Sequence, residues 1–245
     1  MVHFSLKFLF ICGDISPLDI QENIDLCELW FKNIFIPWVN NLPVQKVFLI
    51  GGNHDFFLDK LGVCKIRDII LDSPVQFKLV YLCDSLYIWN EWSIYGCPHV
   101  IDMHGWAFNS EFPYKEFKQI PDCDILLTHT PPKIGEIGRS LISLWDWGTL
   151  QLNKVLQSKK IKYLFCGHVH DGDHRLLKYN DTYLKNVAYK NDDYIPGYEI
   201  TYLELPINEN EQENYSIARA AGEWQINVRP ISSEGEPDIC SGQSG

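Results

Sequence analysis

Four short segments of the chain contain residue types that bind metal ions. They are Cys12-Gly13-Asp14, Gly52-Asn53-His54-Asp55, Leu127-Thr128-His129 and Cys166-Gly167-His168-Val169-His170. Together they supply carboxylate, amide and imidazole ligands, a donor set that suits Mn, Fe or Zn better than Ca or Mg alone. The pattern therefore predicts a site for a divalent transition metal.

Each segment alone also has an ordinary explanation. A Gly-Asp pair after a strand is usually a turn, and a single histidine such as His129 is usually a hydrogen-bonded side chain. His168 and His170 are as often part of a surface loop as a pair of ligands. The order of the segments favours the metal site, because each directly follows a predicted strand. Strand ends on one edge of an α/β sheet converge, so we expect these side chains to meet in one crevice.

The elements that position these residues predict a layered α/β fold. Short apolar runs predict buried strands over residues 7–12, 47–50, 125–128 and 162–166. Apolar side chains at helical spacing predict helices over residues 19–36 and 149–157. Further expectations are antiparallel strands within 76–96, a long loop with short helical pieces over 97–122, and short strands near 175–178, 183–188 and 198–204. For the first helix we expect a cap at Ser16 or Asp19 and an end or a kink at Pro37.

Composition narrows the class of protein. The 245 residues are 46% hydrophobic, which suits one large folded domain over residues 1–205, followed by a polar, partly disordered tail over 206–245. The net charge of −11 disfavours a nucleic acid partner. No apolar run reaches the roughly 18–20 residues that span a bilayer, and the run at 8–12 is too short for a signal peptide. Eight cysteines at irregular spacing are expected to be free thiols, which favours a cytoplasmic location.

In this order the motifs resemble those of the calcineurin-like metallophosphoesterases. That family's signature runs Asp-x-His, Gly-Asp, Gly-Asn-His-Asp/Glu, a single His and Gly-His-x-His, and the last four parts stand between residues 13 and 170. Further segments are similar to the metallophosphoesterase-domain branch of the family: Tyr95-Gly96-Cys97-Pro98, Gly105-Trp106-Ala107-Phe108-Asn109, Thr128-His129-Thr130-Pro131-Pro132 and Gly167-His168-Val169-His170-Asp171-Gly172. The resemblance covers roughly residues 7–205.

The resemblance implies a two-layer αββα sandwich with a dinuclear metal centre. Asp14 would bridge the two metals. Asn53, His129 and His168 would bind the second metal, and His170 would bind the first. Two such cations would activate a shared water as hydroxide and neutralise the phosphoryl oxygens during attack.

The resemblance also implies residues that act on the substrate. His54 would lie beside the leaving group and donate a proton or stabilise the transition state. Asp55 would orient His54, or serve as an acid at a helix N-terminus. Apart from the resemblance, Trp106 and Asn109 are expected to contact the substrate. Trp106 and Phe108 would stack on a nucleobase or an aryl ester, although most aromatic residues serve the core.

One part of the signature is missing. The Asp-x-His motif should stand upstream of Asp14, where the sequence has His3 and no Asp. The sandwich is therefore expected to lack its first strand, and the first metal keeps only Asp14 and His170, so one or two ions would bind. A late start, a truncation or a derived single-metal protein would explain this, and the first two are favoured because the other motifs are intact.

These patterns predict a metal-dependent phosphoesterase that acts on a small substrate. The bond would be a phosphodiester, such as a cyclic nucleotide, or a phosphomonoester. The alternatives are a non-catalytic or weakly active metal-binding remnant of the family, and a nuclease, which the net charge disfavours. His99, His104 and His174 are expected to be loop residues, with His99 or His104 lining the pocket as a lesser alternative. The oligomeric state is left open.

Overall fold

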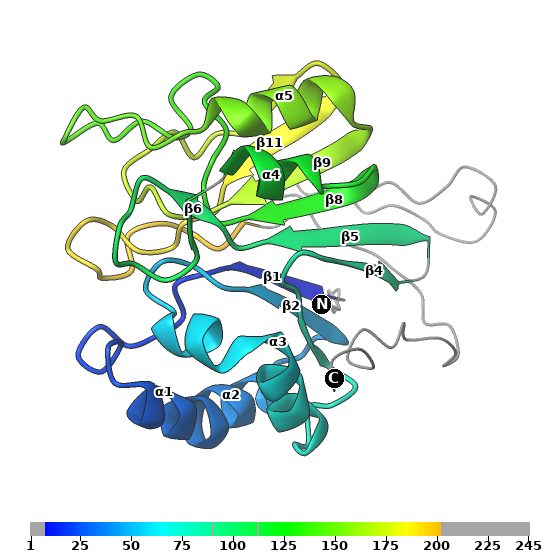
Figure 1. Ribbon diagram of the computed structural model, residues 1–245, viewed down its shortest axis with the longest axis vertical. Coiled ribbons are helices and arrows are strands. Elements are labelled where there is room, and N and C mark those ends of the chain that lie inside the picture. Colours follow the sequence, from blue (N-terminus) through cyan, green and yellow to red (C-terminus); the bar gives the residue numbers. More distant parts are fainter. Residues whose placement is uncertain (1–7, 90, 112, 202–245) are drawn as a thin grey trace, which may run out of the picture.

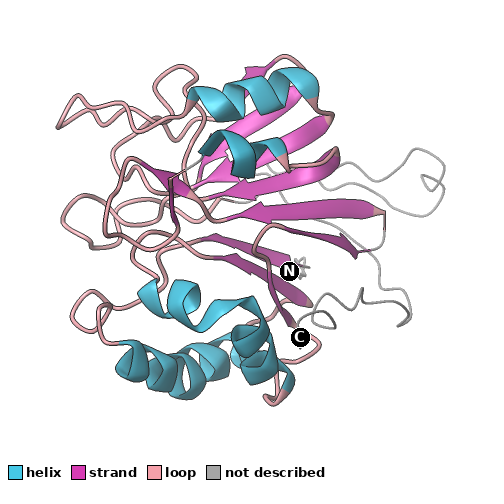
Figure 2. Ribbon diagram, in the orientation of Figure 1, coloured by secondary structure: helices cyan, strands magenta, loops and turns pink. Residues whose placement is uncertain are grey.

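Two β-sheets lie face to face at the centre of the molecule, and helices cover the outer side of each sheet (Figures 1 and 2). This arrangement comes from a computed structural model that describes residues 8–89, 91–111 and 113–201. The layers follow the order helix, sheet, sheet, helix, which confirms the predicted αββα sandwich.

The smaller sheet has three parallel strands in the order β1-β2-β3. These strands are β1 (Phe8–Cys12), β2 (Lys46–Ile50) and β3 (Leu79–Tyr81). The chain connects them through α1 (Ile24–Trp30), the π-helix η1 (Phe31–Phe35), α2 (Ile36–Asn41) and α3 (Phe56–Leu71). Their apolar faces form one core with the outer face of this sheet.

The larger sheet has six strands in the order β10-β11-β9-β8-β5-β4. Its central strands β5 (Trp92–Cys97), β8 (Cys123–Thr128), β9 (Ile161–Cys166) and β11 (Thr182–Asn186) are parallel, and β4 (Ser85–Trp89) and β10 (Leu177–Tyr179) are antiparallel edges. Helices α4 (Pro113–Lys118) and α5 (Leu150–Ser158) cover its outer face. Strands β6 (Val100–Ile101) and β7 (Asn109–Ser110) form a separate short pair.

Large apolar side chains fill the space between the two sheets. Phe48 and Ile50 of β2 are fully buried there against Ile125 and Leu127 of β8. Burial of such side chains is the main force that holds the sheets together. Because the sheets are fixed face to face, the loops at their common edge keep constant positions relative to one another.

The first helix differs from its prediction at both ends. It begins at Ile24, because the side chain of Asn23 accepts a hydrogen bond from the Leu26 backbone N–H at 3.0 Å; the predicted caps at Ser16 and Asp19 are wrong. Pro37 does not end the helical segment either. It lies in the first turn of α2, which continues from η1 to Asn41, and a proline needs no amide partner there.

Other predicted elements have mixed outcomes. The strands predicted at 7–12, 47–50, 125–128 and 162–166 are present within a residue or two. No helix was predicted over residues 56–71, apart from the alternative that Asp55 is an acid at a helix N-terminus. The structure has α3 there, with a non-helical residue, Gly62, at φ 75°. Residues 198–201 form no strand, and residues 202–204 and the predicted tail lie outside the described residues.

Two remaining predictions concern the cysteines and the membrane. None of the seven cysteines that the structure describes is in a disulfide, which agrees with the prediction. Within the described residues, no helix combines the length and the apolar character that crossing a bilayer requires.

Candidate metal centre

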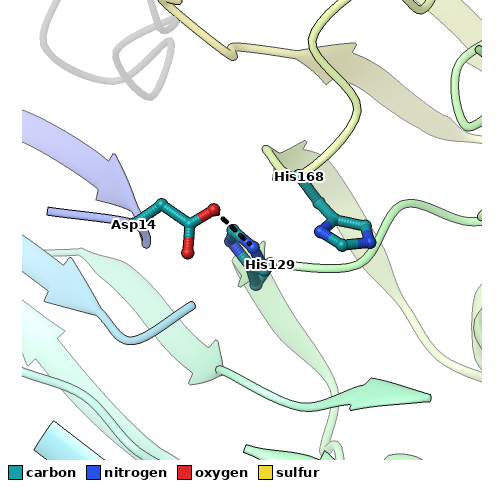
Figure 3. A group of neighbouring side chains, drawn as sticks. All are labelled: Asp14, His129 and His168. Atoms are coloured by element: carbon teal, nitrogen blue, oxygen red, sulfur yellow. Dashed lines mark ion pairs between the residues drawn. The ribbon is translucent and has the colours of Figure 1, made fainter. Parts of the chain in front are cut away.

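The four predicted ligand segments follow the C-terminal ends of β1, β2, β8 and β9. The loops after these strands place the side chains of Asp14, Asn53, His129 and His168 next to one another. Figure 3 shows three of them, which extend from three different loops into the same space. The prediction that strand ends would gather these residues matches their positions in the structure.

The potential ligand atoms lie close together, and three pairs of them are within 3.2 Å. His129 Nε2 is 3.2 Å from Asp14 Oδ2 and 2.9 Å from Asn53 Oδ1. His168 Nδ1 is also 2.9 Å from the same amide oxygen. The ligand atoms of Asp14, His129 and His168 all lie within 4.8 Å of one another. Carboxylate, amide and imidazole groups at this spacing fit a transition-metal ion.

The hydrogen bonds around His129 give a second test of that fit. Its Nδ1 lies 2.7 Å from the backbone oxygen of Cys12 and can only donate a proton there. In neutral His129, Nε2 is then an acceptor, and it faces two further acceptors, the oxygens of Asp14 and Asn53. Three acceptor atoms that face each other need a positive charge between them. A second proton on His129 or a metal cation meets that need.

The electrostatics of the group prepare it for a cation. Burial raises the pKa of Asp14, but the charges and hydrogen bonds of His129 and His54 together outweigh it, so the pKa lies below its usual range and the carboxyl stays ionised. Burial lowers the pKa of His129, but the Asp14 carboxylate outweighs it and leaves that pKa raised. Burial and then the neighbouring His129 lower the pKa of His168 to about 3. His168 is therefore a neutral imidazole, the form that binds metals.

The backbone around the centre is unusually constrained. Asp14 and His168 have φ values of 57° and 70°, a region that residues other than glycine rarely adopt. Two glycines allow the loops to approach this closely. A Cβ on Gly13, at φ 91°, would stand 2.5 Å from His129 Nδ1, and one on Gly52 would stand 2.3 Å from Asp14 Oδ1. Strain of this kind is typical of functional sites.

Asp55 holds two of these loops together. Its buried carboxylate accepts hydrogen bonds from the backbone N–H groups of Asp14, Ser16 and Gly52, at 2.8–2.9 Å, and from the Ser16 hydroxyl. Burial and then the Asp14 carboxylate raise its pKa to about 6. Asp55 is the N-cap residue of α3, so it stands at a helix N-terminus as the alternative prediction had it, although its side chain makes no capping hydrogen bond. The carboxylate hydrogen bonds above are with Asp14, Ser16 and Gly52, and not with the other predicted partner, His54.

Gln21 orients His54 instead. The Nδ1 atom of His54 lies 2.6 Å from Gln21 Oε1, which can only accept, so Nδ1 carries the proton and Nε2 has none in the neutral ring. The His54 backbone N–H donates to Asp14 Oδ1 at 2.9 Å, which ties this residue to the ligand group. Burial is the largest cause that lowers the pKa of His54.

His170 lies apart from the ligand group. Its ring is 5.0 Å from the ring of Tyr194, and its Nδ1 is 3.9 Å from Asp192 Oδ1. The described ligand cluster contains Asp14, His129 and His168, without His170. The role of His170 as a ligand of the first metal remains a prediction.

The two predicted substrate residues occupy a loop that packs on the centre. The ring of Trp106 is 4.8 Å from the ring of His54 and is 37% exposed. The side-chain oxygen of Asn109 accepts a hydrogen bond from the Met103 backbone N–H at 2.9 Å, so Asn109 closes the loop. The Ala107 N–H in turn donates to the backbone oxygen of Asn53. Trp106 therefore has a surface available for a substrate, whereas Asn109 has a structural contact.

Sequence analysis missed three residues around the centre. They are Gln21, Trp147, whose ring is 5.9 Å from that of His168, and Tyr194, whose ring is 5.9 Å from that of His54. None belongs to a motif, because each comes from a connection outside the four segments. The aromatic residue types of Trp147 and Tyr194 were the only signal that the sequence offered for them.

Comparison with known proteins gives a family-level match. The model of the family described as calcineurin-like phosphoesterase matches residues 5–172. The curated protein called metallophosphoesterase domain-containing protein 1, from Homo sapiens and from Mus musculus, is 25% identical over 231 residues. Each alignment covers 82% of this chain and 65% of the relative, so this chain spans slightly less than two thirds of the relatives' length.

The fold comparison agrees with the layers described above. One solved crystal structure superposes with a TM-score of 0.58 at 17% identity and covers 74% of this chain and 79% of its own. At that identity the similarity establishes the shared fold alone.

Proposed function

Because the chain belongs to the calcineurin-like phosphoesterase family, we propose that it hydrolyses small phosphodiesters at the centre formed by Asp14, Asn53, His129 and His168. The observation on which this proposal depends is the convergence of acceptor atoms around His129 Nε2, 2.9 Å from Asn53 and 3.2 Å from Asp14. Such a group of acceptors suits a divalent cation. The cation would be Mn, Fe or Zn, and one or two ions would bind.

The chain's own residues have distinct roles in this proposal. A bound divalent cation supplies Lewis-acid chemistry, which neutralises charge on the phosphoryl oxygens and activates water. Asp14, Asn53, His129 and His168 hold that cation. His54, oriented by Gln21, meets the leaving oxygen through Nε2. The negative charge of a bound phosphate favours the protonated ring, which then donates its Nε2 proton to the leaving group.

The aromatic residues around the centre support a substrate with a planar group. Trp106 contacts His54, Trp147 contacts His168, and each ring is 37–40% exposed. Partly exposed indole rings beside a reaction centre offer stacking surfaces for a nucleobase or an aryl group. A cyclic nucleotide or an aryl phosphodiester is therefore the favoured class, and a phosphomonoester comes second. The net charge of −11 argues against a nucleic acid strand.

A second candidate function is metal binding with little turnover. It is favoured by the position of His170, whose ring contacts Tyr194 and lies outside the ligand cluster. A centre with one filled site would activate water less strongly than a pair of cations.

A paired assay distinguishes the two candidates. The full chain, loaded with Mn²⁺, is incubated with an aryl phosphodiester and with the matching aryl phosphomonoester. Hydrolysis of the diester that is lost in His129→Ala but kept in His104→Ala, a variant of an exposed histidine, supports the phosphodiesterase. Tight Mn²⁺ binding without turnover of either ester contradicts it and favours the second candidate.

A further inference from the structure

A second group of metal-ligating side chains lies at the end of β5, outside the centre described above. It consists of Asp84, in the turn before β4, Cys97, the last residue of β5, and His99, two residues further along the chain. Their ligand atoms all lie within 4.8 Å of one another, and Asp84 Oδ2 is 2.6 Å from His99 Nε2. A thiol, an imidazole and a carboxylate are thus in close contact.

Two carboxylate oxygens at this position lack partners. Asp84 Oδ1 and Glu116 Oε2, the latter on α4, are buried and make no hydrogen bond within the part of the chain that the structure describes. Burial raises the pKa of Glu116, and the charges of His99 and Asp84 act on its carboxyl group as well. Buried oxygens without partners are costly, so each calls for a bound proton, water or cation.

The group is also sheltered from solvent. Cys97 is fully buried, and the side chains of His99 and Asp84 are 14% and 28% exposed. Because Asp84 is the most exposed of the three side chains, an ion would enter from its side. The Cys97 thiol has a pKa raised well above its usual value by burial, so binding of a metal must displace its proton.

We propose that Asp84, Cys97 and His99 form a second metal site, selective for a thiolate-binding divalent ion such as Zn²⁺, with a water molecule in the fourth position. Cysteine, histidine and carboxylate ligands around a four-coordinate ion are characteristic of zinc sites. The residues of the main centre include no thiol, so the two sites differ in the metals that they prefer. This inference does not depend on phosphoesterase activity.

Such an ion would add a link at the point where two hydrogen-bonded strands meet. Asp84 leads into the edge strand β4, and Cys97 ends the central strand β5. The Cys97 backbone oxygen accepts a hydrogen bond from the His129 N–H at 3.3 Å. The second site would therefore fix the strand end that supports a ligand of the main centre.

The alternative is a buried ion pair without a metal. Burial lowers the pKa of His99, but the hydrogen bond and charge of Asp84 and the charge of Glu116 outweigh it, so the pKa is raised. A protonated His99 between two carboxylates would satisfy the same oxygens. This arrangement leaves Cys97 a protonated thiol, whereas a bound metal requires a thiolate.

Cd²⁺ titration of the metal-free full chain tests the proposal, because cadmium–thiolate bonds absorb in the ultraviolet. We expect a saturable band at one equivalent in the wild type, in His129→Ala and in Cys64→Ser, which removes an exposed cysteine. We expect Cys97→Ser and His99→Ala to lose the band while they keep the native circular dichroism spectrum.

The wild-type titration is decisive even if a variant fails to fold. Absence of a cadmium–thiolate band in the folded wild type would overturn the proposal and leave the buried ion pair. A band that disappears in Cys64→Ser would overturn it as well, because the thiolate would then be the exposed one. Neither outcome depends on turnover, so failure here is distinguishable from failure of the proposed phosphodiesterase.

Discussion

Replacement of Asp55 by Asn should weaken the loops that form the metal centre. One carboxylate oxygen accepts from the backbone and the hydroxyl of Ser16, and the other accepts from the N–H groups of Asp14 and Gly52. Asparagine has the same shape but only one acceptor oxygen. If the asparagine oxygen keeps the contacts with Ser16, the amide NH₂ group lies against the backbone N–H groups of Asp14 and Gly52. These two donors then have no acceptor.

The size of the effect follows from those two donors. A buried donor without an acceptor costs about 1–3 kcal/mol, so two of them cost about 2–6 kcal/mol. Loss of the Asp55 charge offsets part of this cost, because the Asp14 carboxylate repels it and raises its pKa. We therefore expect the free energy of unfolding to fall by about 2 kcal/mol or more, a large share of the 5–15 kcal/mol that is typical of a domain.

Urea unfolding of the metal-free protein, followed by circular dichroism, measures this change. Asp59→Asn is the matched control, because Asp59 is an exposed acid on the same helix. Calorimetric titration with Mn²⁺ should also show weaker binding to Asp55→Asn, since the loops of Asp14 and Gly52 are no longer held together. If Asp55→Asn and Asp59→Asn have the same free energy of unfolding and the same Mn²⁺ affinity, Asp55 does not position the centre.

Three further predictions concern the centre itself. His54→Ala should keep its Mn²⁺ affinity while turnover falls by roughly 10²–10⁴-fold, the usual effect of a lost proton donor; a loss of metal would instead make His54 a ligand. Gly52→Ala should lose Mn²⁺ binding in calorimetry, because its Cβ would lie 2.3 Å from Asp14 Oδ1, and unchanged affinity would contradict the close approach. Mn²⁺ affinity should decrease as the pH falls through the raised pKa of His129, because the proton that Asp14 stabilises on that ring competes with the metal; titrations at several pH values that give one constant affinity would refute this.

The main ligands were predictable from sequence because their positions depend on a simple rule. Asp14, His129 and His168 each follow a strand within a few residues, and parallel strands bring their C-terminal ends to one edge. Neither the exact loop conformations nor a metal is needed for that expectation. The alternation of strands and helices likewise predicted a layered α/β fold, whereas the αββα sandwich was what the family resemblance implied.

The contacts that orient these ligands were not predictable in the same way. Asp55 bonds to the Asp14 backbone 41 residues earlier, and His54 meets Gln21 33 residues earlier. These pairs depend on loop shapes that no periodic pattern encodes. Helix α3 was missed for a related reason, because packing against the smaller sheet outweighs the local signal of Gly62. At Pro37 the prediction allowed an end or a kink, and the helical segment continues through the proline.

The separation of the ligands along the chain has a consequence for folding. The backbone oxygen of Cys12 and the His129 side chain that contacts it are 117 residues apart, and Asn53 and His168 are 115 apart. An unfolded chain therefore holds no preformed cluster of these groups, and a metal ion has little to bind before both sheets have docked. Contacts between such distant residues also make folding slow, because long loops must close before the contacts form. The ion should thus bind late during refolding. Its binding would indicate that the native state has formed and would not direct its formation.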